Sequence, residues 1–559
     1  MRTLRWTLIG AVALAVAAVA VAGAGAGRGE DQLAKINHIV VIYQENHSFD
    51  NLYGGWESVR GLGSADVAHT TQVDQAGVAY SCLKQNDVNL ALISIGACTA
   101  PSGFPNTWFT IDNYIPSTAV TCPKPLQGFS FPNGLLNGDP RALPGGCTRD
   151  IVHKFYQEQY QLNGGAQNRY VTGSDAIGLA MGVYDTQQLP IYRYLHGPGS
   201  PRYAIADDFF QAAFGGSFLN HQWLIAAATP VYPGAPANLH SIVDSAGFPR
   251  NNYPLYTPLP GATYRDSDLT VTCDSPVKPG GACGDYAVNT MQPPFWPQGT
   301  FGDKLLYPQV NPTIGDTLTA KGVDWAWYAG GWDNAVGNTD GLGWTNGTTP
   351  GTCGDPNHDP LNSVFPHCPD NLFQYHHQPF NYFANYAPGM PGRVHLQDEE
   401  NFVNAAQTST GACNLKPVSF VKPVGEENEH PGYASTPSGS DHLVDLLQAI
   451  ENSSCAKDTM VIVTYDEFGG QWDHVPPPGQ GLTPGPHDMW GPGTRIPALV
   501  VSPFLRGNFV VDHTQYDTTS ILATIEKRWN LAPLGPDTRD GKVNDLSNVF
   551  AAKESEATK

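Results

Sequence analysis

The chain has 559 residues, of which 41% are hydrophobic and 14% charged, and its net charge is −21. The hydrophobic fraction can build a sizeable core, which excludes disorder of the whole chain. With 60 glycines and 47 prolines, the composition is typical of a loop-rich globular protein and excludes a coiled coil or helical repeat. The excess of acids argues against a nucleic-acid partner, because the chain would repel the phosphates that it had to neutralise.

Residues 1–27 have the features of an export signal. Arg2 and Arg5 lead into the uncharged apolar run Trp6–Val21, and a stretch of small residues follows. This order is typical of a cleavable signal peptide. The alternative is an uncleaved membrane anchor, but the Ala and Gly content makes the run only weakly hydrophobic. We therefore expect a secreted or periplasmic protein with no stable membrane insertion after cleavage.

The ten cysteines all follow this segment, and an even number in an exported chain indicates disulfide bonds. None forms a CxxC motif, so a zinc ribbon or a thioredoxin-like site has no support. Most are sequence neighbours in Gly- and Pro-rich loops. Sequential pairing is the expectation, although sequence leaves other connectivities open: Cys82–Cys98, Cys122–Cys147, Cys273–Cys283, Cys353–Cys368 and Cys413–Cys455.

Short apolar runs along the chain predict buried strands. In chain order they cover residues 36–43, 323–328, 418–421, 460–465 and 496–501. Apolar residues at helical spacing predict amphipathic helices over 440–452, with Ser440 as its cap, and over 518–529. Helices followed by apolar strands indicate an α/β fold with a largely parallel central sheet flanked by helices.

The domain organisation that we expect is simple. After the signal, residues 28–535 form a single domain, with long loop insertions at about 55–150 and 228–310 that are rich in Pro, Gly, Cys and Asn. Residues 536–559 are polar, and we expect them to fray or to lie on the surface as a C-terminal tail.

Oxygen-bearing side chains follow two of the predicted strands. The sequence QENHSFDN follows residues 36–43, and DEFGGQWDH follows residues 460–465. Ligands bind beyond the carboxyl ends of strands in open α/β sheets. Carboxylate and amide oxygens suit a hard divalent cation such as Mg²⁺, Ca²⁺ or Mn²⁺. Either cluster alone is equally well explained as turn chemistry, but two clusters after two core strands favour a metal site.

Ser217 follows two glycines and precedes the apolar segment Phe218–Ala228, which is suited to a helix. A helix N-terminus offers free N–H groups and a positive dipole end, where a phosphate is stabilised. Serine needs a metal or a base to become a good nucleophile. A simple helix-capping role is the alternative for Ser217.

Several segments carry a resemblance to a known family. HIVVIYQENHSFDNLYG, TYDEFGGQWDHVPPP and GTRIPALVVSPF resemble the bacterial phosphoesterase family that contains secreted acid phosphatases and phospholipases C. HKFYQEQYQLNGG, FGGSFLNHQ, HHQPFNYF and EHPGYASTPSGSDHLVDLL match in the family's order, so the resemblance runs from about residue 36 to 530. It implies a fold like that of the alkaline-phosphatase superfamily.

The resemblance also implies roles for individual residues. Glu45, Asn46, Asp466 and Glu467 would be the ligands of one divalent metal ion, although relatives often carry Asp at the position of Glu467. Ser217 would be the nucleophile that forms a phosphoserine.

Histidines would face the transferred phosphoryl group. By resemblance these are His153, His377 and His430, and His376 is equally able to share the work of its neighbour. Charged imidazoles would neutralise phosphate oxygens, and one would protonate the leaving alkoxide, so an acidic pH optimum is expected. His474 is expected to have a structural role.

The family contains two activities that fit this chain. A secreted acid phosphatase acting on small phosphate monoesters is favoured, because phospholipase-like relatives tend to carry Thr where this chain has Ser217. The larger phospholipases also have C-terminal extensions, whereas about thirty residues follow Trp529 here. One alternative is a phospholipase C that cleaves the phosphodiester of phosphatidylcholine or sphingomyelin, with the choline headgroup held by aromatics. The other is a non-catalytic secreted binding protein on the same fold.

Overall fold

The computed structural model describes residues 27–84, 86–87, 94–95, 103–115, 118, 148, 150–248, 263–274, 277–278, 280–295, 297, 304–345, 373–432 and 434–555. The expected export signal lies outside these ranges except for its last residue. Among the described helices, none combines the length and the apolar character needed to span a membrane.

The core of the protein is an eight-stranded sheet with the strand order β11-β10-β12-β1-β13-β14-β8-β15. In chain order its strands are β1 (His38–Gln44), β8 (Tyr203–Ala206), β10 (Trp325–Ala329), β11 (Leu396–Asp398), β12 (Val418–Lys422), β13 (Thr459–Tyr465), β14 (Ala498–Val501) and β15 (Phe509–Asp512). Strand β14 runs antiparallel to both neighbours, and the other pairs are parallel. The expected α/β fold with a largely parallel sheet is confirmed.

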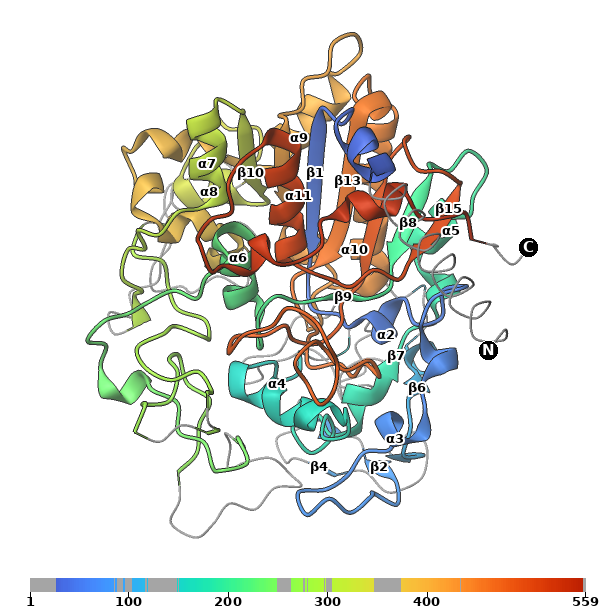
Figure 1. Cartoon of the computed structure of the whole chain (residues 1–559), viewed down its shortest axis with the longest axis vertical. Helices are drawn as coiled ribbons and strands as arrows, with labels where there is room; N and C mark the ends of the chain where they lie inside the picture. Colours follow the sequence, from blue (N-terminus) through green and yellow to red (C-terminus); the bar gives the residue numbers. More distant parts are fainter. Residues whose placement is uncertain are drawn as a thin grey trace, which may run out of the picture.

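Helices and short strands surround this sheet. The α-helices are α2 (Phe49–Leu52), α3 (Val67–Thr70), α4 (Phe155–Leu162), α5 (Pro190–Leu195), α6 (Ser217–Ala226), α7 (Ile314–Lys321), α8 (Trp332–Val336), α9 (Glu399–Gln407), α10 (Thr436–Glu451) and α11 (Thr519–Trp529). Two-stranded pairs are formed by β2 (Leu83–Lys84) with β5 (Gly103–Phe104), β3 (Asn86–Asp87) with β4 (Ser94–Ile95), β6 (Phe109–Thr110) with β7 (Gly182–Val183), and β9 (Phe209–Phe210) with β16 (Tyr516–Asp517). Figure 1 shows β1 between β10 and β13, with α4 and the small strands β2 and β4 below the sheet.

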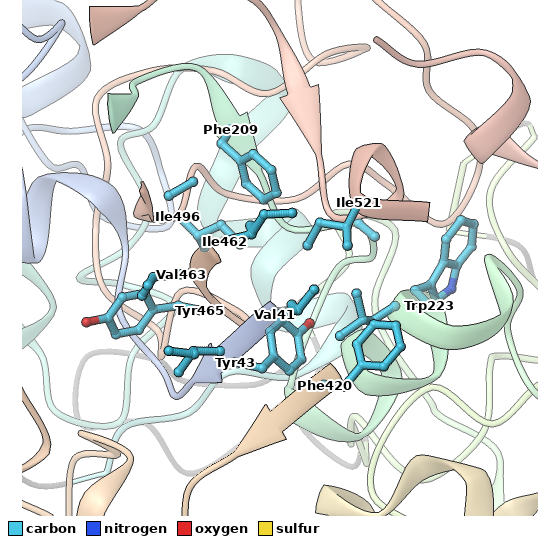
Figure 2. Close-up of a cluster of buried hydrophobic side chains, with 14 of the residues drawn as sticks. Val41, Tyr43, Phe209, Trp223, Phe420, Ile462, Val463, Tyr465, Ile496 and Ile521 are labelled. Carbon is cyan, nitrogen blue, oxygen red and sulfur yellow. The ribbon is translucent and has the colours of Figure 1, made fainter. Parts of the chain in front are cut away.

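Helices cover both faces of the sheet. The Tyr43 hydroxyl donates to the carbonyl of Asn220 in α6 at 3.3 Å, and the next side chain, Gln44, donates to the carbonyl of Gly439 in α10 at 3.4 Å. Because successive side chains of a strand point to opposite faces, α6 and α10 lie on opposite sides of β1. Figure 2 shows Trp223 of α6 and Ile521 of α11 among the buried side chains of the sheet.

The predicted start of the helix over 440–452 was wrong. Helix α10 begins at Thr436, and the Ser435 side chain accepts the N–H of Ser438 as its cap. Ser440 is buried within the helix, where its hydroxyl accepts the N–H of Ile191 at 3.1 Å. The first turn, Thr-Pro-Ser-Gly, carries no large apolar residue, so hydrophobic spacing alone could not reveal it, and a proline is compatible with the first turn of a helix.

The expectation of a frayed or surface-lying tail from residue 536 was also wrong for much of that segment. Leu546, Val549 and Phe550 are fully buried, and the Arg539 side chain is paired with Asp517 at 3.0 Å. Apolar residues at a spacing of three to four in an otherwise polar sequence were enough to bring this segment into the core.

Two predicted disulfides are confirmed, Cys273–Cys283 and Cys413–Cys455. Cys82 is also disulfide-bonded. The other three expected pairs each include a cysteine outside the described residues. The division into one domain with insertions at about 55–150 and 228–310 stays a prediction, since much of both insertions lies outside the described ranges.

Candidate active site

The two oxygen-rich sequences meet at the ends of neighbouring strands. Strands β1 and β13 are parallel and adjacent, and their register pairs Gln44 with Tyr465. The residues that follow, Glu45–Asn46 and Asp466–Glu467, therefore emerge side by side, and all four are fully buried.

A tight contact between the two loops fixes these side chains. The Asn46 N–H donates to Asp466 Oδ1 at 3.1 Å, and Asn46 has a positive φ of 62°. Gly469 in the second loop has φ of 63°, and a Cβ at this position would lie 2.2 Å from the Asn46 carbonyl oxygen. Only glycine allows such a close approach at this point.

Ser217 lies against these side chains at the start of α6. Its Oγ is 3.1 Å from Glu45 Oε2, 3.3 Å from Asn46 Oδ1 and 3.2 Å from Glu467 Oε1. A hydroxyl has one proton to donate, so it can satisfy only one of three acceptors. The N-cap of α6 is Gly216, and no side chain caps this helix end. The Ser217 hydroxyl therefore faces the carboxylates and does not serve as a helix cap.

The carboxylates crowd one another. Burial, together with the neighbouring Glu45, raises the pKa of both Asp466 and Glu467 well above the ordinary range. Burial would also raise the pKa of Glu45, but the Lys422 ammonium and His377 hold it well below the ordinary value. Asp466 Oδ2 is buried and has no hydrogen-bond partner in the described part of the chain.

This donor set fits a divalent metal ion. Three carboxylates and one amide oxygen around a hydroxyl are the hard ligands that Mg²⁺, Ca²⁺ and Mn²⁺ prefer, and a divalent charge would relieve the repulsion among them. Glu467, despite its extra methylene, lies as close to Ser217 Oγ as Glu45 does. The donor chemistry of the residues predicted as ligands therefore suits one divalent metal ion, of a kind that the donor set does not single out, and their assignment as ligands stays a prediction.

Two of the predicted histidines flank Asn46. The Asn46 side-chain nitrogen is 3.4 Å from His153 Nε2 and 3.0 Å from His430 Nε2. His153 Nε2 also lies 3.5 Å from Glu467 Oε1. Both imidazoles thus lie at the same place as the serine and the carboxylates.

The structure separates the neighbours His376 and His377, which sequence could not. His377 is buried, its Nε2 lies 3.0 Å from Glu45 Oε1, and burial lowers its pKa to about 4. His376 is partly exposed and lines the cavity in front of Ser217. His377 thus contacts a predicted metal ligand, while His376 faces the space that a substrate would enter.

Two further residues complete the site, and sequence analysis missed both. Lys422, the last residue of β12, is fully buried, pairs with Glu45 and donates to the Tyr43 carbonyl at 3.0 Å. His221 lies one helical turn after Ser217 and donates from Nδ1 to the Ser217 carbonyl at 2.8 Å. The available signals were a lysine that closes an apolar run and a histidine four residues after the serine, and both occur in many proteins without such a role.

A cavity of about 540 Å³ opens onto the serine. Most of the residues that line it are of polar types, and they include His153, His376 and His430, the carboxylates Asp150, Asp175 and Asp268, and the lysines Lys154 and Lys304. The site is therefore accessible to a small polar substrate.

His474 lies elsewhere. Its Nδ1 is 2.5 Å from Asp50 Oδ2, and Arg495 and Asp473 complete this second buried cluster. The position agrees with the expected structural role.

Comparisons with known proteins place the chain in a family. The Phosphoesterase family model matches residues 36–532. The chain is 24% identical over 544 residues to phospholipase C A of Mycobacterium tuberculosis (strain H37Rv), covering 93% of this chain and 78% of that protein. It is 28% identical over 271 residues to the non-hemolytic phospholipase C of Burkholderia pseudomallei, covering 43% and 35%.

Solved structures show weaker similarity. The 2-O GAG sulfatase BT1596 matches with a TM-score of 0.29 and 11% identity, covering 68% of this chain and 72% of that one. A protein in the alkaline phosphatase superfamily from Vibrio parahaemolyticus matches with a TM-score of 0.27 and 13% identity, covering 74% of each chain. Scores this low carry no argument. The family match covers most of the sequence, and on that basis the chain belongs to the Phosphoesterase family and is a hydrolase that acts on phosphate esters.

Proposed function

We propose that this protein is a secreted acid phosphatase that hydrolyses phosphate monoesters through a phosphoserine intermediate on Ser217, assisted by one divalent metal ion. The observation that carries the proposal is the convergence of three acceptor oxygens within 3.3 Å of the Ser217 hydroxyl at the mouth of a polar cavity.

In the first step, Ser217 Oγ attacks phosphorus and the bond from phosphorus to the leaving oxygen breaks. The hydroxyl proton passes to a neighbouring carboxylate, since Glu45 and Glu467 both lie within 3.2 Å of it. Glu45, Asn46, Asp466 and Glu467 would hold the metal, which would favour the serine alkoxide and neutralise phosphate charge.

The histidines supply the remaining groups. His153 and His430 lie beside Asn46 and line the cavity, so a protonated imidazole at either place can hydrogen-bond a phosphate oxygen or give its proton to the leaving alkoxide. Burial lowers the pKa of His430 below the ordinary value, so acidic solution is needed to charge its imidazole. In the second step, water attacks the phosphoserine and releases phosphate.

The cavity lining favours a monoester over a choline diester. Quaternary ammonium groups are recognised by several aromatic faces, and Phe218 is the single aromatic residue among the described side chains that line this cavity, apart from the histidines. Lys154 and Lys304 line the same cavity and would attract the second negative charge of a monoester, while Lys304 also pairs with Asp268 at 3.3 Å and Lys154 donates to the Asp266 carbonyl at 3.1 Å.

Phospholipase C activity is the second candidate. The relatives described above are named phospholipases C, and Asp150, Asp175 and Asp268 on the cavity wall would attract the positive charge of a choline headgroup.

The test compares p-nitrophenyl phosphate with p-nitrophenyl phosphorylcholine at about pH 6, near the ordinary imidazole pKa. The protein is assayed with added Mg²⁺, Ca²⁺ or Mn²⁺, beside Ser217→Ala and the control Ser440→Ala, which removes a buried hydroxyl that accepts the N–H of Ile191. We expect faster hydrolysis of the monoester, and a loss of about 1000-fold or more in kcat/KM for Ser217→Ala alone.

A preference for the choline diester would move the assignment to phospholipase C and keep the site. Equal rates for Ser217→Ala and the unaltered protein would remove Ser217 as nucleophile. No turnover of either substrate with any of the metals would favour the non-catalytic binding protein.

A further inference from the structure

The two oxygens of the Glu45 carboxylate contact different groups. Its Oε2 lies 3.1 Å from Ser217 Oγ, on the side of the proposed metal ion. Its Oε1 lies 3.0 Å from His377 Nε2 and 3.8 Å from His221 Nε2, and pairs with the Lys422 ammonium. One carboxylate that bridges two cation positions is the arrangement by which two-metal phosphatases hold ions about 3.5–4 Å apart.

The side chains around Glu45 Oε1 are of the types that bind metal ions. His221 Nδ1 donates to the Ser217 carbonyl, so the neutral ring presents the lone pair of Nε2 toward Glu45. That nitrogen is buried and has no hydrogen-bond partner among the described residues. The ligand atoms of Glu45, His221 and His377 lie within 4.8 Å of one another, and the two rings are stacked at 5.3 Å. Two imidazoles with one carboxylate are a common donor set for Zn²⁺.

Lys422 already supplies a positive charge there. Its side chain is fully buried, its ammonium contacts Glu45 Oε1, and it donates to the Tyr43 carbonyl at 3.0 Å. Because Lys422 closes β12 and β12 pairs with β1, the backbone holds this charge beside Glu45 permanently. A divalent ion on the same oxygen would be repelled by it.

We propose that Lys422 is a built-in substitute for a second metal ion: its ammonium occupies the position defined by Glu45, His221 and His377 and limits the site to one metal. The inference rests on the proposed function in one respect, namely that a metal binds on the Ser217 side of Glu45. Lys422 is on this account a positioning residue, which turns the other oxygen of Glu45 toward Ser217.

The test is the stoichiometry of Zn²⁺, measured by calorimetric titration and by metal analysis after dialysis. Lys422→Ala removes the charge and leaves a space that a metal ion can enter, whereas Lys422→Met removes the charge and fills that space with an apolar side chain. We expect Lys422→Ala to bind one equivalent more than the unaltered protein and Lys422→Met to bind no more than it. The extra equivalent should be lost in Lys422→Ala/His377→Ala. Lys416→Ala, at a partly exposed lysine paired with Asp324, is the matched control and should leave the stoichiometry unchanged.

Thermal unfolding provides a second measurement, which also applies if Lys422→Ala folds poorly. Zn²⁺ should raise the unfolding temperature of Lys422→Ala, or restore its folding, and should not do so for Lys422→Met. The proposal is overturned if Zn²⁺ neither adds an equivalent to Lys422→Ala nor stabilises it, or if the unaltered protein fills the His221–His377 position itself. If the proposed function fails instead, the unaltered protein binds no metal beside Ser217. Glu467→Gln, which alters that site, would then bind as many equivalents of Zn²⁺ as the unaltered protein.

Discussion

The loops after β1 and β13 each contribute to two buried polar clusters, and the two clusters differ in their balance of charge. The active-site cluster contains the carboxylates of Glu45, Asp466 and Glu467, which all lie in the fully buried interior. The single permanent cation that pairs with them among the described residues is Lys422. In this cluster the carboxyl groups outnumber the cationic side chains that pair with them.

In the second cluster one arginine pairs with two carboxylates. Arg495 lies 3.1 Å from both Asp50 and Asp473 and donates further to the carbonyl of Asp207 at 2.8 Å, while His474 contacts Asp50. Burial would raise the pKa of Asp50, but His474 and Arg495 lower it below the ordinary value. Burial raises the pKa of Asp473 to about 6, although Arg495 lowers it in part.

The two clusters therefore divide these loops by role. A buried cluster whose carboxylates share an arginine and whose hydrogen bonds are filled can hold the fold together without any ligand. A buried cluster in which carboxyl groups crowd one another and one oxygen, Asp466 Oδ2, has no hydrogen-bond partner among the described residues is stable only if a bound cation brings the opposite charge or if carboxyl groups take up protons. The same two loops therefore carry a half that we propose binds the metal, called the metal-binding half below, and a structural half.

The largest expected effect is in the metal-binding half. Glu467→Gln removes one carboxylate beside Ser217 and should lower kcat/KM by about 1000-fold, because the transition state loses charge stabilisation. The metal-free protein should not lose stability, since the change relieves repulsion. Activity assays measure the first effect, and chemical denaturation in EDTA measures the stability of the metal-free protein. A variant that is both active and destabilised would contradict the assignment of Glu467 to the metal-binding half.

The opposite result is expected in the structural half. Arg495→Met leaves Asp50 and Asp473 buried without their partner, and should lower the free energy of unfolding by about 3–5 kcal/mol. Metal affinity of the folded fraction should be unchanged. Urea denaturation measures the free energy of unfolding, and a metal titration measures the affinity. An unchanged unfolding midpoint would show that this cluster does not hold the loops.

A smaller effect is expected at Glu158, a buried carboxylate that links the two halves. It accepts the N–H groups of Gly215 and Thr494 at 2.5 and 2.7 Å and the Gln211 side chain at 2.9 Å. Gln211 in turn accepts the N–H of Phe468, next to the metal ligands. Glu158→Ala leaves these donors unfilled and should cost about 2 kcal/mol of stability and about tenfold in kcat. A stability loss with unchanged kcat would refute the positioning role.

The smallest effect concerns a third cluster, Glu399–Glu427–His442, away from the serine. Burial alone would lower the pKa of His442, but Glu399 and Glu427 outweigh it and raise the pKa to about 9. A raised pKa in the folded state gives stability that is fully present below about pH 6.5 and is lost as pH rises through about 9. We expect His442→Gln to be less stable than the unaltered protein by about 2 kcal/mol at pH 6 and to differ little at about pH 9.5. A difference in unfolding free energy between the two proteins that does not depend on pH would contradict a charged His442.

Sequence predicted the strands and the loops that follow them, because β-branched runs and oxygen-rich turns are local signals. The ligand set Glu45, Asn46, Asp466 and Glu467 came from motifs in two such loops, and these residues do meet. Lys422 could not be predicted, because its role depends on β12 pairing with β1, which lies some 380 residues earlier in the chain. Strand order is a tertiary property that a local pattern does not contain.

Burial of single residues was equally hard to anticipate. Ser440 looked like a helix cap because the apolar spacing begins after it, yet the helix starts at Thr436. Phe550 and its neighbours looked like a polar tail because charged residues surround them, yet they fill a gap beside α11 and β15. In each case packing against a distant element decided the outcome.

Ser217, beside the crowded carboxylates, is the proposed acceptor of the phosphoryl group. This role is tested by mixing the metal-loaded protein with a phosphate monoester, quenching it in acid within the first turnover, and analysing the peptides by mass spectrometry. We expect one phosphoryl group on the peptide that contains Ser217, absent from Ser217→Ala. Turnover without a phosphoryl group on Ser217, or with one on a histidine instead, would contradict it.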